Sequence, residues 1–270
     1  MKINLEKVKI GSDPEVFLKD DKEIVSSIGL IEGNKREPHD IGNDCGIQTD
    51  NVLAEYTFPP VSLEQPEKFY ENVRYCIDYT DNFLKDKNIK VSIQSSGYVN
   101  EKYFDNEQAR EAGCSPDFNV WTKSVNEPAD YANSNLRTAG CHIHIGYKNP
   151  TDQVSEEIVK VLDLFLAIPS LFIDKDTERR KMYGKAGCFR FKQYGVEYRV
   201  LGNFVIQDQD TVNWLFRNIK AALEFINSGA FVDHDQKNIV EAINTNNLDL
   251  ARVLADKYQL ETEVKKEIKV

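Results

Sequence analysis

Hydrophobic and polar residues alternate over much of the first sixty positions, in short runs separated by turn-forming residues. Such alternation is typical of β-strands, because successive side chains of a strand point to opposite faces. Strands are predicted within residues 7–20, 23–31, 46–58, 90–99 and 140–147. Residues 188–204 predict a hairpin that turns near Gly195.

Apolar residues at helical spacing predict a helix over residues 62–87 and another over 151–173, which Thr151 would cap. The chain from about residue 208 onward predicts a helical tail, with helices at 210–226, 236–246 and 248–258 and a solvated helix end at 261–270. Residues 100–135 are polar and turn-rich, as in a long functional loop. The order of elements indicates an α+β fold with a mixed or antiparallel sheet.

Composition narrows the class of protein. The 270 residues carry a net charge of −10, which argues against a nucleic-acid partner because phosphate binding depends on clustered Lys and Arg. No apolar run approaches the ~20 residues that span a bilayer, and the first residues lack the apolar core of a signal peptide. We therefore expect a cytoplasmic protein with no membrane partner. The five scattered cysteines contain no CxxC pair, which argues against a structural zinc site and against a disulfide framework.

Four predicted strands place ionisable residues beside apolar ones. The pairs that share a strand or its start are His142 and His144, Glu197 and Arg199, Asp13 and Glu15, and Asp50 and Glu55. Each pair alone fits a strand with one wet face, and the two histidines could be satisfied strand side chains. If the strands share a sheet face, however, several carboxylates converge, and at ~4 Å two of them repel by about 4 kcal/mol at an effective dielectric near 20.

A cluster of this kind either protonates or binds cations. Oxygen ligands with few nitrogens and no thiolate favour Mg²⁺ or Mn²⁺ over zinc. Arg199 beside Glu197 would then place a guanidinium where phosphate oxygens meet the metal ions.

Five motifs follow one another between about residues 8 and 205: GSDPEVFL, TDNVLAEYTFPP, GCSPDFN, RTAGCHIHIGY and YGVEYRVLGN. Together they resemble the phage-type carboxylate–amine ligases (COOH–NH2 ligase type 2) of the glutamine synthetase and glutamate–cysteine ligase superfamily. The resemblance implies a glutamine-synthetase-like sheet, curved and mainly antiparallel, that forms a half-barrel backed by helices. It also implies ATP and two or three Mg²⁺ ions on the concave face, with Mn²⁺ as a compatible substitute.

The same resemblance implies a catalytic domain over residues 1–207. Residues 208–270 match nothing that we recognise in the family, and we expect them to pack on the same domain as a helical extension. The implied metal ligands are Asp13, Glu15, Asp50, Glu55, His142 and Glu197. Asp13 stands where the family's G-x-E-x-E strand has its first Glu. The implied phosphate or substrate contacts are Arg199, Arg190, Arg137 and His144, although Arg190 also fits a solvated strand position.

The activity that the resemblance implies is ATP-dependent amide-bond formation through an acyl phosphate. Its substrates would be small molecules or peptides that bear a carboxylate and an amine, in the cytoplasm of a phage-infected host. Glu197 and Arg199 would stabilise phosphoryl transfer, and Asp117 is a candidate base for the incoming amine. Asp117 also fits a plain Ser-Pro-Asp turn.

Three alternatives stay open. The same fold could phosphorylate a guanidino or carboxyl group and stop there, or it could bind nucleotide as a non-catalytic scaffold. A metallohydrolase that uses His142 and His144 is less favoured, because only His234 follows them in the chain. The sequence leaves the oligomeric state open and is compatible with a homo-oligomer.

Overall fold

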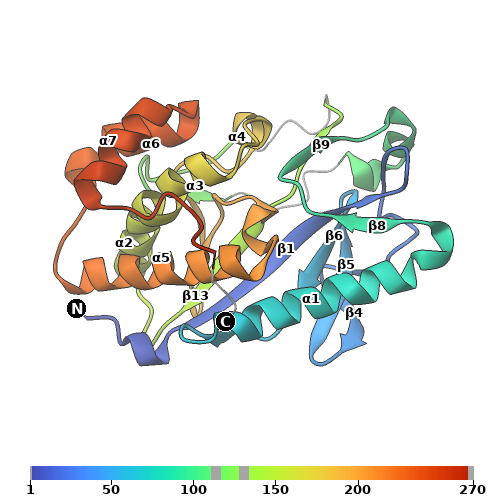
Figure 1. Ribbon diagram of the computed structural model, residues 1–270, viewed down its shortest axis with the longest axis horizontal. Coiled ribbons are helices and arrows are strands. Elements are labelled where there is room, and N and C mark those ends of the chain that lie inside the picture. The colour runs from blue at the N-terminus through green and yellow to red at the C-terminus, as the bar shows by residue number, and fades with distance from the viewer. Residues whose placement is uncertain (1, 111–116, 128–133, 267–270) are drawn as a thin grey trace.

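The computed structural model describes residues 2–110, 117–127 and 134–266. In this part of the chain, 13 strands form one antiparallel sheet, whose main path runs β11-β10-β14-β15-β13-β1-β6-β5-β4-β3 (Figure 1). The bounds along that path are β11 Ser124–Val125, β10 Phe118–Asn119, β14 Cys188–Lys192, β15 Gly195–Tyr198, β13 Cys141–Gly146, β1 Lys9–Lys19, β6 Leu53–Thr57, β5 Cys45–Asp50, β4 Glu37–Gly42 and β3 Gly33–Asn34. Three further strands pair with β1: β2 Ile24–Val25, β7 Val61–Ser62 and β8 Lys90–Ser92. The predicted α+β fold with a mainly antiparallel sheet is confirmed.

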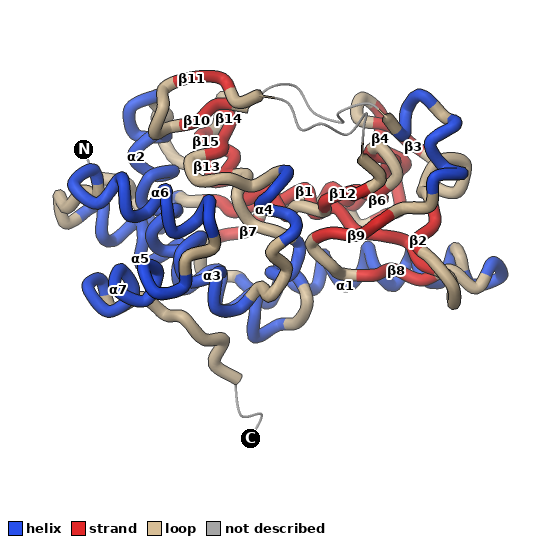
Figure 2. The backbone as a smooth tube through the Cα atoms, turned by 90° about the horizontal axis from the view of Figure 1, so that it is seen from above, coloured by secondary structure: helices blue, strands red, loops and turns tan. Residues whose placement is uncertain are grey.

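The sheet is curved and is not closed into a barrel. Figure 2 shows its two ends, at β11 and at β3–β4, bending toward the same side, away from α1 (Pro66–Phe83). A separate two-stranded sheet joins β9 (Ser96–Tyr98) to β12 (Leu136–Thr138). The concave side of the large sheet therefore faces away from α1, and a functional site can lie on it.

Strand β1 is the central strand of the sheet. Its first half pairs with β13, and Glu15 and Val16 pair with β6, so this strand joins the half of the sheet that contains β13 to the half that contains β6. Ile10, Val16 and Leu18 are fully buried in the main core. The alternate residues, Asp13 and Glu15 among them, project from the other face of the strand because side chains alternate.

Helices cover the convex face. These are α1, α2 (Asp152–Leu162), α3 (Ile168–Ile173), α5 (Gln209–Asn227), α6 (Gln236–Thr245) and α7 (Leu248–Tyr258), and α4 (Glu178–Met182) precedes β14. Phe69 of α1 packs edge-on against Phe216 of α5, with ring centroids 5.3 Å apart. Thr151 caps α2 as expected, since its side chain accepts a hydrogen bond from the Val154 amide. The proposed division at residue 207 stays a prediction. No helix in the described ranges has the length and apolarity to cross a membrane.

Several local predictions were wrong. Residues 46–58 form two strands, β5 and β6, because Asn51 at φ 56° makes a tight turn between them. Residues 90–99 are likewise split between β8 and β9, which belong to different sheets. The predicted loop 100–135 contains the short strands β10 and β11 and two 3₁₀ turns. The paired strands β3 and β4 and the helix α4 were not predicted.

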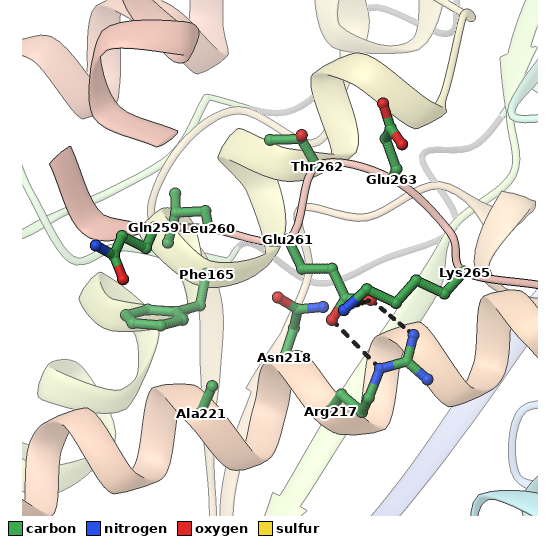
Figure 3. A pocket seen from close by; sticks show the side chains of 10 residues that line it. All are labelled: Phe165, Arg217, Asn218, Ala221, Gln259, Leu260, Glu261, Thr262, Glu263 and Lys265. Atoms are coloured by element: carbon green, nitrogen blue, oxygen red, sulfur yellow. Dashed lines mark hydrogen bonds and ion pairs between the residues drawn. The ribbon is translucent and has the colours of Figure 1, made fainter. Parts of the chain in front are cut away.

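The end of the chain, predicted as a helix end, leaves the helical state after Tyr258, and the described residues up to 266 follow an irregular path. The Glu261 carbonyl accepts a hydrogen bond from Trp214 Nε1 at 2.9 Å, and the Glu261 carboxylate pairs with Arg217 at 2.7 Å (Figure 3). Between this tail and α5 lies a cavity of about 460 Å³. The tail is thus anchored to α5 by contacts that helical periodicity does not reveal.

The predicted helix 151–173 is interrupted by a π-helical turn at Asp163–Ala167. The fully buried carboxylate of Asp163 accepts hydrogen bonds from Trp121 Nε1 at 2.6 Å and from the Tyr198 hydroxyl at 2.8 Å. Burial raises the pKa of Asp163 to about 7, against the opposing effect of these hydrogen bonds. Asp163 therefore ties the helical layer to β15 from behind the site face.

Replacing Asp163 by Asn should remove a pH dependence of stability. The folded protein binds the Asp163 proton more tightly than the unfolded chain does, so this group stabilises below pH ~4, and that stabilisation is lost as the pH rises through about 7. As the pH rises from 4 to 8, the unfolding free energy of the variant relative to that of the wild type should increase by about 2–4 kcal/mol. Urea denaturation across this range measures the gain. Parallel curves would show that Asp163 is already ionised at pH 5.

Candidate active site

Strand pairing places the predicted site residues in rows across the concave face. Gln48, Glu55 and Glu15 are opposite one another on β5, β6 and β1. Asp13 pairs with His142 on the next strand. A further row runs from His144 on β13 through Glu197 on β15 to Arg190 on β14. Residues from six strands therefore converge on one surface.

At the centre lie Asp13, His142 and Glu197, with one ligand atom from each all within 4.8 Å of one another. His142 Nδ1 is 3.2 Å from Asp13 Oδ1 and 3.8 Å from Glu197 Oε1. His144 Nε2 is 3.5 Å from the other Asp13 oxygen. Burial alone would raise the pKa of Asp13, but His142 and His144 together hold it well below its usual value.

The remaining acidic residues lie beside this centre. Glu15 Oε2 accepts a hydrogen bond from the Gly140 amide at 2.7 Å, and Glu55 Oε2 accepts one from Gln48 at 2.8 Å. Burial, with repulsion from neighbouring carboxylates that include Asp50, raises the pKa of Glu15 and raises that of Glu55 well above its usual value. A carboxylate whose ionised form is disfavoured in this way gains from a bound cation.

Several buried polar atoms at this centre make no aligned hydrogen bond within the described ranges: Asp13 Oδ1, His142 Nε2, His144 Nε2 and Glu197 Oε2. An unsatisfied buried polar atom is costly, and native structures keep such atoms mainly where a ligand satisfies them. The mixture of carboxylate oxygens and imidazole nitrogens suits a divalent cation. The residues present therefore fit a metal site.

Arg199 is held in a fixed orientation next to this centre. Its NH1 contacts Glu197 and lies 3.3 Å from His142 Nδ1. Its Nε and NH2 donate to the Tyr183 hydroxyl at 2.8 and 2.5 Å, and that hydroxyl donates to Asp117 at 3.0 Å. The sequence did not single out Tyr183, which lies 16 residues from Arg199 in the chain.

Asp117, the candidate base, is 8% exposed in its side chain and lies 3.4 Å from Arg199 Nε. Its other oxygen accepts a hydrogen bond from Asn126 at 2.9 Å. This environment suits a residue that orients Arg199, while the role of Asp117 as base stays a prediction. Residues 113–116 of the GCSPDFN motif lie outside the described residues.

Two further cations surround Glu197. Lys192 Nζ is 2.6 Å from Glu197 Oε2, and Arg190 NH1 is 3.7 Å from Glu197 Oε1. The contact of Arg190 with Glu197 favours a site position over a solvated strand position. Lys192 was missed, although it lies two residues from Arg190 and so shares its strand face.

Two of the predicted residues have other surroundings. Arg137 is 2% exposed, and its guanidinium donates to Asn51 Oδ1 and to the carbonyl oxygens of Ser134, Leu136 and Ala109. It also stacks on Phe104, 4.3 Å from the ring centroid. These contacts describe a residue that ties loops together. Asp50 pairs with Lys35 at 2.9 Å and lies at the end of β5, beside the central group.

A cavity of about 940 Å³ adjoins the centre and includes Asp13, Glu55 and His144 in its lining. Its walls also contain aromatic and proline residues and four lysines: Phe58, Pro60, Tyr147, Pro150, Tyr194, Lys7, Lys9, Lys35 and Lys148. Its volume is within the range of small-molecule sites, about 300–1,000 Å³. Apolar walls, cationic groups and an acidic floor occur together in one cavity.

Part of the chain is similar to a known protein family. Residues 129–258 match the family model described as Phage phiEco32-like COOH.NH2 ligase-type 2. This segment, just under half of the chain, is similar to that family. No curated protein matches the chain.

The matched segment contains His142, His144, Arg190, Glu197 and Arg199. It extends through α5, α6 and α7, so the expectation that the helices after residue 207 match nothing in the family was wrong. Asp13, Glu15 and Glu55 precede the matched segment, and they meet its residues only through the pairing of β1 with β13 and β6.

Proposed function

We propose that the protein is an ATP-dependent carboxylate–amine ligase that uses Mg²⁺ on the concave face of its sheet. The observation that carries the proposal is the convergence of Asp13, His142, His144 and Glu197 beside the 940 Å³ cavity, each with a buried polar atom that makes no aligned hydrogen bond in the described part of the chain. An acidic floor under a lysine-bearing cavity suits a metal-bound polyphosphate, because the carboxylates neutralise the metal and the lysines neutralise the phosphates.

In this proposal Asp13, His142 and Glu197 hold a metal ion, and Glu15 and Glu55 supply carboxylates for a further one. A divalent ion in such a site neutralises phosphate charge during phosphoryl transfer. Asp50 would act through its neighbours, since Lys35 already pairs with it. The walls formed by Phe58, Tyr147 and Tyr194 would receive the base of the nucleotide.

The chain's own residues would act by positioning. Arg199, oriented by Tyr183 and Asp117, directs NH1 toward the central group, where it would stabilise charge on the transferred phosphoryl group. The substrate carboxylate would leave this step as an acyl phosphate, and attack by the amine would release phosphate and form the amide. The amine must lose a proton, for which Asp117 is the proposed acceptor.

The test is ADP release from the purified protein with Mg²⁺-ATP, supplied with pools of carboxylic acids and amines. We expect ADP release that requires both an acid and an amine and stops when a chelator removes Mg²⁺. ADP formation with an acid or guanidino compound alone, and a stable phosphorylated product, would instead identify a phosphotransferase. If the wild type binds no Mg²⁺-ATP by calorimetry, the proposed function is wrong.

A further inference from the structure

The charges on the concave face are distributed unequally. Four basic nitrogens, from Arg199, Lys192, Arg190 and His142, lie within 3.8 Å of the Glu197 carboxylate. Within the described part of the chain, no basic side chain lies within ion-pair distance of Glu15 or Glu55. Basic groups therefore gather at Glu197, where His142 and Arg199 also contact Asp13 and Asp117. Glu15 and Glu55, on other strands of the same face, lack such partners within the described ranges.

The basic residues at Glu197 differ in how firmly they are held. Arg199 is 2% exposed in its side chain, and the Tyr183 hydroxyl accepts bonds from two of its nitrogens. Lys192 is 33% exposed in its side chain and contacts Glu197 through a flexible four-carbon stem. Although Lys192 Nζ lies only 2.6 Å from Glu197 Oε2, that oxygen accepts no aligned hydrogen bond. Lys192 is therefore less firmly held than Arg199, although its ion pair with Glu197 must break when it leaves.

Lys192 also lies close in the chain to the cavity that would bind the nucleotide. The next two residues, Gln193 and Tyr194, line the 940 Å³ cavity. The turn that follows Lys192 therefore borders this cavity, while the Lys192 side chain lies on Glu197.

We propose that Lys192 is an exchangeable counter-ion: it neutralises Glu197 in the metal-free protein and moves to a phosphate oxygen of the ligand when a metal ion takes Glu197 Oε2. The inference rests on the proposed function, since it assigns a residue to the same site. Without nucleotide, the metal ion and Lys192 compete for the same oxygen of Glu197. With nucleotide, both the metal ion and Lys192 attract the polyphosphate. Removal of the lysine charge should therefore raise the affinity for the metal ion alone and lower the affinity for the metal–nucleotide complex.

The test compares Lys192→Met with wild type in two binding measurements. Mn²⁺ alone, titrated and followed by electron paramagnetic resonance, should bind about 5- to 10-fold more tightly to the variant. A non-hydrolysable ATP analogue with Mg²⁺, followed by calorimetry, should bind roughly 10-fold more weakly. The control is Lys85→Met, which removes an exposed lysine just after α1 and outside the cavity and should change either affinity by less than about twofold.

Unchanged or weaker Mn²⁺ binding by Lys192→Met would overturn the inference, as would equal effects of both variants on Mn²⁺. Tighter Mn²⁺ binding with unchanged affinity for the analogue would overturn the transfer to phosphate. If the wild type itself bound neither Mn²⁺ nor the analogue, the proposed function would fail, and this inference with it. The wild-type titrations thus separate the two failures.

Discussion

Replacing Glu197 by Gln is expected to weaken Mn²⁺ binding by on the order of 10²- to 10³-fold and to abolish metal-dependent nucleotide turnover. Glutamine keeps the shape of the side chain but removes the charge from the centre of the group formed with Asp13 and His142. One unit charge at ~4 Å is worth about 4 kcal/mol at an effective dielectric near 20, which corresponds to nearly three orders of magnitude in affinity. The substitution also leaves Arg199, Arg190 and Lys192 to repel an incoming cation.

Calorimetric titration of Mn²⁺ measures this loss directly, without knowledge of the substrates. Because Glu197 is buried among cations, its removal should also lower the melting temperature, so folding must be checked by circular dichroism. Asp163→Asn is a matched control: it makes the same change in a buried carboxylate that lies behind the sheet and should leave Mn²⁺ affinity within about twofold. Wild-type affinity in Glu197→Gln would show that the group formed by Asp13, His142 and Glu197 is not a metal site.

Replacing Arg137 by Met should destabilise the fold by about 3 kcal/mol or more while leaving Mn²⁺ affinity unchanged. The guanidinium donates to three carbonyl oxygens and to Asn51, and each buried acceptor that loses its donor costs roughly 1–3 kcal/mol. The packing on Phe104 is lost in part as well. Because lysine lacks the planar fork, Arg137→Lys should recover only part of the stability.

Urea denaturation gives the free energies, and Arg36→Met, at an exposed position, is the control that should change stability by less than about 0.5 kcal/mol. The family resemblance implies a different result, in which Arg137 contacts phosphate or substrate. A variant with wild-type stability that no longer binds the ATP analogue would support that role and would contradict the structural one.

Much of the fold follows from local pattern. The alternation in β1 and β13 and the helical spacing in α1, α2 and α5 are strong because each element buries one face against a single core. Short elements were missed because they contain too few residues to show a period: β10 and β11 span two residues each. The turn at Asn51 was missed because asparagine tolerates a positive φ without a glycine to mark the turn.

The candidate site divides in a similar way. The sequence by itself determined which residues share a strand face, since alternation puts His142 with His144 and Glu197 with Arg199 regardless of what lies beside them. Only the tertiary structure decided which faces meet. The pairing of β1 with β13 brings Asp13 to His142, more than a hundred residues away, and the pairing of β1 with β6 places Glu15 opposite Glu55. It also decided that Arg137 ties loops together, and it added Tyr183 and Lys192 around Arg199 and Glu197. Strand register and side-chain burial depend on long-range contacts, and for that reason no local pattern of residues contains them.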